Sequence, residues 1–257
     1  MTASANPASH PLKGRTALIT GGNTGIGRAV ALAYARAGAD VAILWLDRED
    51  EAHSLAREFA ALGRRCIPLR CDVTDEAQVA AAFSDAVAAL GHLDILVNNA
   101  GIQLARPILD TSVADWDRMA AVHLRGAFLC AREAARHMIP RKSGRVICTV
   151  SQLPYLGREN YLAYSTMKAG MLGFIRALAR ELAPHGILVN GVGPGLIDTG
   201  FDPLPVERKQ AIAASLPLGR LADPDDVAPS YVFLAGDDAK FFCGQVIHPN
   251  GGQIMHG

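Results

Sequence analysis

The sequence predicts an α/β fold of the doubly wound type, in which helices cover both faces of a parallel sheet. From Thr16 onward, short β-branched or apolar runs alternate with longer Ala-rich stretches of helical period, as in successive βαβ units. No linker or repeat interrupts this alternation, and 257 residues of which 50% are hydrophobic can bury a full core. We therefore expect one domain over residues 13–257, preceded by a flexible tail over residues 1–12.

Seven short runs bounded by turn or polar residues are predicted strands. They are Thr16–Thr20, Val41–Leu46, Cys66–Leu69, Ile95–Val97, Val146–Val150, Leu188–Val192 and Gln245–His248. The stretches between them predict helices over Ile26–Ala37, Glu49–Leu62, Glu76–Leu90, Val113–Met138, Leu162–Ala183 and Asp225–Ala235. Helix start signals agree at two places, because Thr74 precedes two acidic residues and Asp223 precedes a proline.

Composition excludes several classes of partner. The formal net charge is zero, so the basic surface of a nucleic-acid or anionic-membrane binder is not expected. The first ten residues lack a basic start followed by an apolar stretch, and no later segment has the apolar length of a membrane span. The 5 cysteines form no C-x-x-C pair, which argues against a disulfide framework and a structural metal site. We expect a cytoplasmic protein with a small-molecule substrate and no metal.

A glycine cluster directly follows the first predicted strand and opens the first helix. Gly21, Gly25 and Gly27 have the spacing G-x-x-x-G-x-G. Glycines let the backbone approach a pyrophosphate closely, and the positive end of a helix favours its charge. The context predicts a dinucleotide site, whereas a tight strand-to-helix turn that binds nothing is the alternative.

A tyrosine and a lysine four residues apart predict a proton donor. Tyr164 and Lys168 lie on one face at the start of a predicted helix. A neighbouring ammonium favours the phenolate, so Tyr164 could exchange a proton near neutral pH during carbonyl reduction. Ser151 follows a predicted strand, where its hydroxyl could bind the same substrate oxygen. An ordinary amphipathic helix edge is the alternative for the Tyr–Lys pair.

Together these motifs resemble the short-chain dehydrogenase/reductase family. The matching segments occur in the family's order and cover nearly the whole chain: TGGNTGIG at 20–27, CDVTD at 71–75, NNAG at 98–101, the Ser151, Tyr164 and Lys168 set, and NGVGPGLIDT at 190–199. The resemblance implies a seven-stranded Rossmann sheet, usually in a homotetramer, and NAD(P)-dependent hydride transfer at a carbon that bears oxygen. It makes Tyr164 the acid/base, Lys168 the group that lowers its pKa and holds the nicotinamide ribose, and Ser151 the partner of the substrate oxygen.

The resemblance also implies cofactor contacts along the whole chain. Asp72 and Val73 are expected at the adenine, Asn98 and Gly101 at the floor of the ribose site, and residues 194–199 at the nicotinamide amide. The full predicted set is Gly21, Asn23, Gly25, Ile26, Gly27, Trp45, Asp47, Asp72, Val73, Asn99, Ala100, Gly101, Tyr164, Lys168, Pro194, Gly195, Ile197 and Thr199.

One catalytic position departs from the family pattern. The family has an asparagine on the helix after NNAG, where it helps to hold a water linked to the lysine, and this chain has His123 there. An imidazole can donate or accept a hydrogen bond, so His123 could replace the asparagine as a catalytic residue. Alternatively, His123 fills a polar hole in the helix.

The choice between NAD and NADP is left open by the residues after the second strand. A carboxylate there binds the ribose 2′-OH, and a basic neighbour binds a 2′-phosphate. Counted from Gly38, the acidic position falls on Trp45 and the basic position on Leu46. Asp47 could reach a hydroxyl and Arg48 a phosphate, or both could be solvated loop charges. Because the excluding carboxylate is absent, the sequence leans slightly to NADP.

The substrate is constrained only weakly. Gln103, Gln152, Glu159 and Asn160 are polar residues near the catalytic set, which favours a sugar, polyol or other secondary alcohol. A 3-oxoacyl thioester is the alternative, because Arg125, Arg132 and Arg136 could hold a carrier phosphate. The segment Leu196–Leu218 is expected to form a mobile lid over the substrate.

Two further hypotheses concern assembly and activity. Apolar residues on the central helices exceed what one face needs, which favours pairing between subunits as well as burial against the sheet. They are Leu124, Phe128, Met167, Met171 and Phe174. A nucleotide-binding sensor or scaffold without turnover is the alternative outside catalysis.

Overall fold

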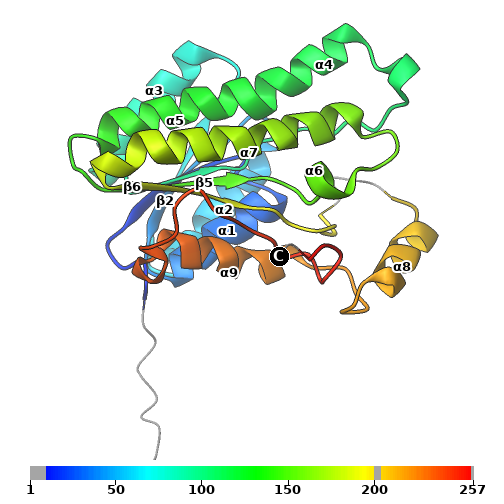
Figure 1. Ribbon diagram of the computed structural model, residues 1–257. Helices are drawn as coiled ribbons and strands as arrows, with labels where there is room; N and C mark the ends of the chain where they lie inside the picture. Colours follow the sequence, from blue (N-terminus) through cyan, green and yellow to red (C-terminus); the bar gives the residue numbers. More distant parts are fainter. Residues whose placement is uncertain (1–9, 200–203, 256–257) are drawn as a thin grey trace, which may run out of the picture.

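The computed structural model describes residues 10–199 and 204–255, and its centre is a parallel sheet of seven strands (Figure 1). The strand order is β3-β2-β1-β4-β5-β6-β7. The strands are β1 (Thr16–Thr20), β2 (Asp40–Trp45), β3 (Cys66–Arg70), β4 (Ile95–Asn98), β5 (Gly144–Thr149), β6 (Ile187–Val192) and β7 (Val246–Ile247). All seven expected strands are present, and every pair is parallel. The predicted doubly wound Rossmann fold is confirmed.

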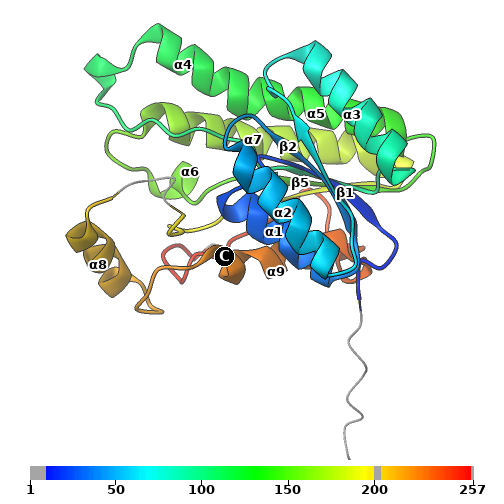
Figure 2. The ribbon, with the colours of Figure 1, turned by 180° about the vertical axis from the view of Figure 1, so that it is seen from behind.

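Two layers of helices cover the sheet, one on each face (Figures 1 and 2). One layer holds α1 (Gly25–Arg36), α2 (Glu49–Ala61) and α9 (Pro224–Ala235), and the other holds α3 (Glu76–Leu90), α5 (Gly126–Met138) and α7 (Leu162–Leu182). Strand residues alternate between the two cores, so that Ile19 faces α1 while Leu18 faces the opposite layer. Burial on both faces explains why the strands are almost continuously apolar.

The helix expected over Val113–Met138 is interrupted. It consists of α4 (Val113–Ala120), a five-residue π-helical segment (Ala121–Arg125) and α5. A π turn adds a residue to the helical repeat and often lies at a functional site, and the apolar periodicity of this stretch contains no signal for it.

Among the described residues, two short α-helices are additional to those expected. The helix α8 (Val206–Ser215) lies within the expected lid segment, and α6 (Leu153–Leu156) follows β5. Part of the lid prediction, residues 200–203, falls outside the described residues. Among the residues that the structure describes, no helix is long and apolar enough to cross a membrane.

The described residues just before the expected domain boundary at residue 13 are already packed against the domain. Leu12 is fully buried, and its backbone N–H donates to the carbonyl of Ala37 at 2.9 Å. The expected tail otherwise falls largely on residues 1–9, outside the described part of the chain.

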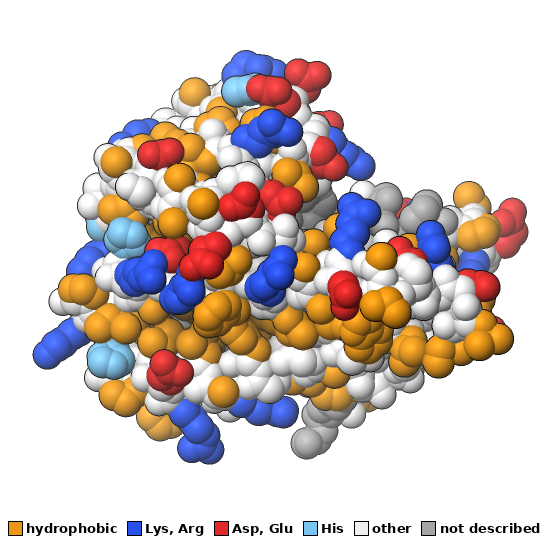
Figure 3. Space-filling view, turned by 90° about the horizontal axis from the view of Figure 1, so that it is seen from above, with side chains coloured by type: hydrophobic (Ala, Val, Ile, Leu, Met, Phe, Trp, Pro, Cys, Tyr) orange, Lys and Arg blue, Asp and Glu red, His pale blue; other side chains and the backbone are white. Residues whose placement is uncertain are grey.

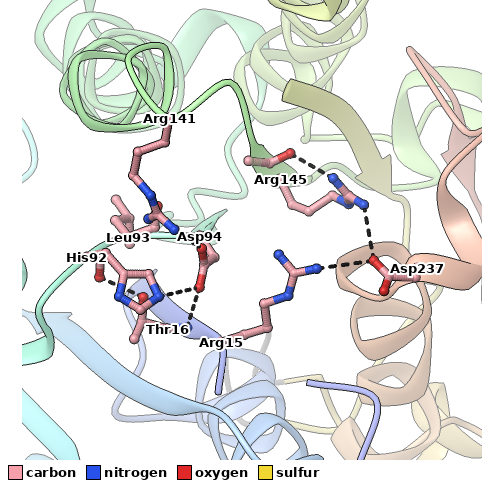
Figure 4. A network of polar contacts seen from close by, with 9 residues as sticks. Arg15, Thr16, His92, Leu93, Asp94, Arg141, Arg145 and Asp237 are labelled. Atoms are coloured by element: carbon pink, nitrogen blue, oxygen red, sulfur yellow. Dashed lines mark hydrogen bonds and ion pairs between the residues drawn. The ribbon is translucent and has the colours of Figure 1, made fainter. Parts of the chain in front are cut away.

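A polar network ties together the amino-terminal ends of the central strands (Figure 4). Asp94, which is 3% exposed, accepts hydrogen bonds from the Thr16 N–H and from Arg141, each at 2.9 Å, and lies 2.9 Å from His92 Nε2. Beside it, the exposed carboxylate of Asp237 lies 3.1 Å from Arg15 and 3.7 Å from Arg145. Hydrogen bonds and ion pairs therefore connect the strands at their amino-terminal ends, and the carboxyl-terminal ends of the strands are left open for a site.

Candidate active site

A cavity of about 700 Å³ lies at the carboxyl ends of the strands. Its walls come from the segments that follow β1, β2, β4, β5 and β6, and include Gly21, Leu46, Asn99, Ser151 and Pro194. The strand order reverses between β1 and β4, and ligands of open α/β sheets bind at such a switch point.

The glycines of the first turn are required by the backbone geometry. Gly21 and Gly25 have φ of +60° and +53°, a conformation that favours glycine. A Cβ on Gly27 would lie 2.1 Å from the Gly21 carbonyl oxygen. At these glycines the backbone of the turn therefore faces the cavity with no side chain in between. No side chain caps the amino terminus of α1. Unused N–H groups at a helix start suit a phosphate, so the residues present fit a dinucleotide.

The loop after β2 is held by Asn23. Its side-chain amide donates to the carbonyl oxygens of Asp47 at 2.8 Å and Arg48 at 3.2 Å. Trp45 is 7% exposed and its ring packs in the core shared with α1, while its Nε1 is buried without a partner among the described residues. Asp47 and Arg48 are exposed and border the cavity.

Tyr164 and Lys168 on α7 share this cavity with Ser151. The Lys168 Nζ lies 5.7 Å from the centre of the Tyr164 ring and donates to the Thr149 carbonyl at 2.7 Å. Burial lowers the pKa of Lys168 to about 8, an effect that the nearby Cys148 partly opposes. The Ser151 Oγ accepts from the Leu153 N–H at 3.2 Å. The arrangement brings a hydroxyl, a phenol and an ammonium group to one wall.

His123 belongs to the same wall because the π-helical segment carries it inward. It is 3% exposed, and its ring meets the Tyr164 ring edge-on at 5.5 Å between centres. Its Nε2 lies 2.7 Å from the Ile102 carbonyl oxygen and 3.2 Å from the Ile102 backbone nitrogen, and its Nδ1 is buried without a partner among the described residues. Burial, followed by the charge of Lys168, lowers the pKa of His123 to about 3, so the ring is neutral near pH 7. A Cβ on Gly101 would lie 2.7 Å from His123, which explains the glycine.

The structure brings nearly all predicted site residues to the cavity. Three of the predicted cofactor contacts do not line it: Gly27, which packs behind the turn, Asp198 and Asn98. Asn98 was expected at the floor of the ribose site but lies off this cavity, where its amide donates to the Ala127 carbonyl at 3.1 Å. Of the polar residues predicted near the substrate, Gln103 and Gln152 line the cavity, whereas Glu159 and Asn160 do not.

Sequence reasoning missed two cationic residues of the wall. Arg118 on α4 and Arg158 before α7 line the cavity, and the Arg158 guanidinium lies 4.3 Å from the centre of the Tyr161 ring. Neither stands in a motif: Arg118 lies on α4, and Arg158 lies in the loop between α6 and α7.

A parallel α/β domain with a glycine turn and a Ser, Tyr and Lys set at one switch point defines a nucleotide-dependent oxidoreductase. The family model described as enoyl-(acyl carrier protein) reductase matches residues 21–253. The chain belongs to the short-chain dehydrogenase/reductase family, whose members use NAD(P) and act on CH–OH groups.

Individual relatives are similar over almost the whole chain. A hydroxy(phenyl)methylsuccinyl-CoA dehydrogenase subunit of Thauera aromatica is 40% identical, over 95% of this chain and 98% of that protein. A 3-oxoacyl-(acyl-carrier-protein) reductase of Staphylococcus aureus is 36% identical, over 94% of this chain and 98% of that protein. The crystal structure of a blue fluorescent protein from a metagenomic library, in complex with NADPH, matches with a TM-score of 0.90 and 36% identity, over 95% of this chain and 100% of that chain.

Proposed function

We propose that this oxidoreductase interconverts a secondary alcohol and a ketone, with Tyr164 as the general acid/base. The observation that supports the proposal is the shared wall of Ser151, Tyr164 and Lys168 in the cavity that also contains the glycine turn. A nicotinamide cofactor, when bound in this cavity, would supply or take the hydride. In the reductive direction, the Tyr164 hydroxyl gives its proton to the forming alkoxide, and the Ser151 hydroxyl donates a hydrogen bond to the same oxygen. Lys168 stabilises the resulting phenolate.

His123 is proposed to act beside Lys168. The Nε2 contact with the Ile102 carbonyl, at 2.7 Å, is shorter than the one with the Ile102 N–H, at 3.2 Å, so we assign the proton to Nε2, which makes Nδ1 a hydrogen-bond acceptor. A second cavity of about 10 Å³, lined by His123, Thr149 and Lys168, has about the size of one water molecule. A water there can accept from the ammonium group and donate to Nδ1. The neutral histidine thus provides the acceptor that the family obtains through an asparagine.

NADP is the proposed cofactor. Trp45 takes the position of the carboxylate that would exclude a 2′-phosphate, and its ring is packed in the core. Arg48 borders the cavity with a guanidinium that suits a phosphate. The similar metagenomic protein was crystallised with NADPH, which agrees with this choice.

The proposed substrate carries a further hydroxyl group near the reacting carbon. Gln152 is 4% exposed and follows Ser151 directly, and its amide nitrogen donates to Gln253. Gln152 lines the cavity, and its Oε1 is buried without a hydrogen-bond partner among the described residues. We propose that the Gln152 side chain turns toward the cavity when substrate binds, so that a substrate hydroxyl satisfies this acceptor, and a site of this kind rejects analogues that lack the hydroxyl.

A 3-oxoacyl thioester is the second candidate, favoured by the names of the two relatives described above. The arginines that could hold a carrier phosphate have other partners here. Arg132 is bonded to Glu76, Arg136 to Glu133 at 2.5 Å, and Arg125 to the Thr74 carbonyl at 3.5 Å. These solvent-accessible contacts are weak, so they neither support nor exclude a carrier phosphate, and the hydroxyl-bearing substrate rests on Gln152.

Exposed apolar side chains on two helices support a proposed homotetramer. Phe128 and Leu162 remain 47% and 45% exposed on α5 and α7, and hydrophobic side chains form a band across this side of the molecule (Figure 3). Met167 and Met171 are instead buried within the subunit. The exposed apolar residues support a homotetramer, which analytical ultracentrifugation would test.

The state of the cysteines supports a proposed cytoplasmic location. All five cysteines are free, in keeping with a reducing cytoplasm.

The proposal is tested first by titrating the protein with NADPH and NADH, following nicotinamide fluorescence. Turnover is then compared on butane-2,3-diol and butan-2-ol, and on an oxoacyl thioester. Tighter NADPH binding with preferred oxidation of the diol supports the proposal. Preference for the thioester supports the second candidate, and cofactor binding without any turnover supports a non-catalytic sensor.

A further inference from the structure

A tyrosine in the helix layer of α1, α2 and α9 is hydrogen-bonded to β5, the strand that leads into the catalytic wall. Tyr231 of α9 is fully buried in the apolar core shared by α1 and α9. Its hydroxyl lies 2.8 Å from the Oγ1 of Thr149, the last residue of β5. A phenol in an apolar core needs a partner, but this partner belongs to the site rather than to the core.

The hydrogen bonds beyond Thr149 have a defined direction. The Asn99 amide nitrogen donates to the carbonyl oxygens of Thr20 and Gly21, each at 3.1 Å. Its Oδ1 therefore acts as the acceptor for Thr149 Oγ1 at 3.2 Å. A threonine hydroxyl has a single proton, which is used in that bond, so the Tyr231 hydroxyl must donate to Thr149. The chain runs from Tyr231 through Thr149 and Asn99 to the glycine turn.

This chain joins two parts of the proposed active site. One end is the Gly21 carbonyl, in the turn that faces the cofactor cavity. Thr149 lies in the middle of this series of hydrogen bonds. Its backbone carbonyl also accepts a hydrogen bond from the Lys168 ammonium at 2.7 Å. Tyr231 itself does not line the cavity, so any effect that it has on the reaction passes through Thr149.

We propose that Tyr231 is a positioning residue, whose hydroxyl holds Thr149 and Asn99 so that the glycine turn and Lys168 keep a fixed spacing. This inference rests on the proposed function of the cavity. Without the hydroxyl, Thr149 can rotate away from Asn99, and the Asn99 amide loses the bond that fixes its orientation toward Gly21. The cavity wall is then less rigid, which weakens cofactor binding and slows proton transfer.

Tyr34 provides a matched control within the same core. It is also fully buried, and its hydroxyl donates at 3.2 Å to the backbone carbonyl of Tyr231. This bond ends on the backbone of α9 and does not involve the Tyr231 hydroxyl, which alone continues toward the cavity. Tyr34→Phe and Tyr231→Phe each remove one buried hydroxyl without changing ring volume, so they share the structural cost and differ in their link to the site.

The experiment compares Tyr231→Phe, Tyr34→Phe and wild type in the full-length protein. Thermal unfolding reports the structural cost, nicotinamide fluorescence gives the Kd for NADPH, and steady-state kinetics separates kcat from KM. We expect similar losses of Tm in the two variants. Only Tyr231→Phe should weaken NADPH binding and lower kcat, each by about three- to tenfold, the size of one neutral hydrogen bond.

Thr149 supplies a second test. Thr149→Val should reproduce the loss of affinity and kcat, Thr149→Ser should restore both, and adding Tyr231→Phe to Thr149→Val should add little. Equal NADPH affinity and kcat in Tyr231→Phe and Tyr34→Phe would reduce Tyr231 to a core residue and overturn the inference alone. Failure of the wild type to bind either nicotinamide would overturn the proposed function and this inference with it.

Discussion

At the residue scale, the chemistry depends on how the two ionisable groups of α7 are placed. Tyr164 and Lys168 occur four residues apart, and this spacing alone predicts that they share a helix face. Their common cavity and the Thr149 carbonyl that receives the ammonium are features of the folded chain. The neutral state of His123 has no sequence signal, because it depends on burial by the π-helical segment.

Replacing the proton donor should separate catalysis from binding. We expect Tyr164→Phe to lower kcat by at least about a hundredfold, the usual contribution of a general acid, while NADPH still binds. Tyr155→Phe is the control, since Tyr155 is 38% exposed on the neighbouring α6 and contacts the ring of His248. Steady-state rates with fluorescence titration check this, and undiminished kcat in Tyr164→Phe would mean that another group gives the proton.

Lys168 should make stability depend on pH in alkaline solution. Burial lowers its pKa from 10.5 to about 8, so between these values the unfolded chain holds a proton that the folded chain has lost. Unfolding then takes up a proton, and the free energy of unfolding rises with pH across this window. Relative to Lys168→Met, the wild type should gain on the order of 3 kcal/mol from pH 8 to 10.5. Urea unfolding at several pH values measures this difference, and parallel curves for the two proteins would contradict it.

At the element scale, the strands were easier to predict than the connections. Each predicted strand is found within about two residues of its expected ends, because burial on both faces demands a continuous apolar run. The break between α4 and α5 could not be predicted, since the residues on either side keep a good helical pattern. The α8 helix was missed because none of its residues is buried, so it lacks the apolar periodicity that marks the other helices.

The first turn of α1 should not tolerate a side chain at Gly27, the last glycine of the G-x-x-x-G-x-G motif. In Gly27→Ala the new methyl group meets the backbone oxygen of Gly21 at 2.1 Å, so the turn itself must move. We expect a loss of about 1–3 kcal/mol of stability and a large loss of NADPH affinity. Gly173→Ala on α7 is the control, because a Cβ there meets nothing within 4 Å and should stabilise the helix by about 0.5–1 kcal/mol. Normal NADPH affinity in Gly27→Ala would show that the turn does not shape the cofactor site.

At the scale of the whole molecule, the two ends of the sheet have different tasks. The carboxyl edge carries the cavity, and its residues were largely predictable because the motifs stand directly after strands. The amino edge is held by the Asp94 and Asp237 contacts, which no motif indicated. They join residues far apart in the chain, such as Thr16 and Asp94, and only the fold brings such pairs together.

Because the cavity and these polar contacts lie at opposite ends of the strands, we predict that substitutions at the amino-terminal ends lower stability without changing catalysis. The Asp94 carboxylate is buried and faces three donors, so Asp94→Asn would leave at least one donor poorly satisfied. We expect the free energy of unfolding to fall by about 1–3 kcal/mol, with kcat and KM unchanged in the remaining folded protein. Asp237→Asn should cost less than about 1 kcal/mol, because the Asp237 side chain is 79% exposed and its ion pairs are screened by water. Urea unfolding and steady-state kinetics on the same preparations test both variants. A fall in kcat for Asp94→Asn at a temperature where it is fully folded would show that the strands transmit changes from one edge to the other, and that the two ends are not independent.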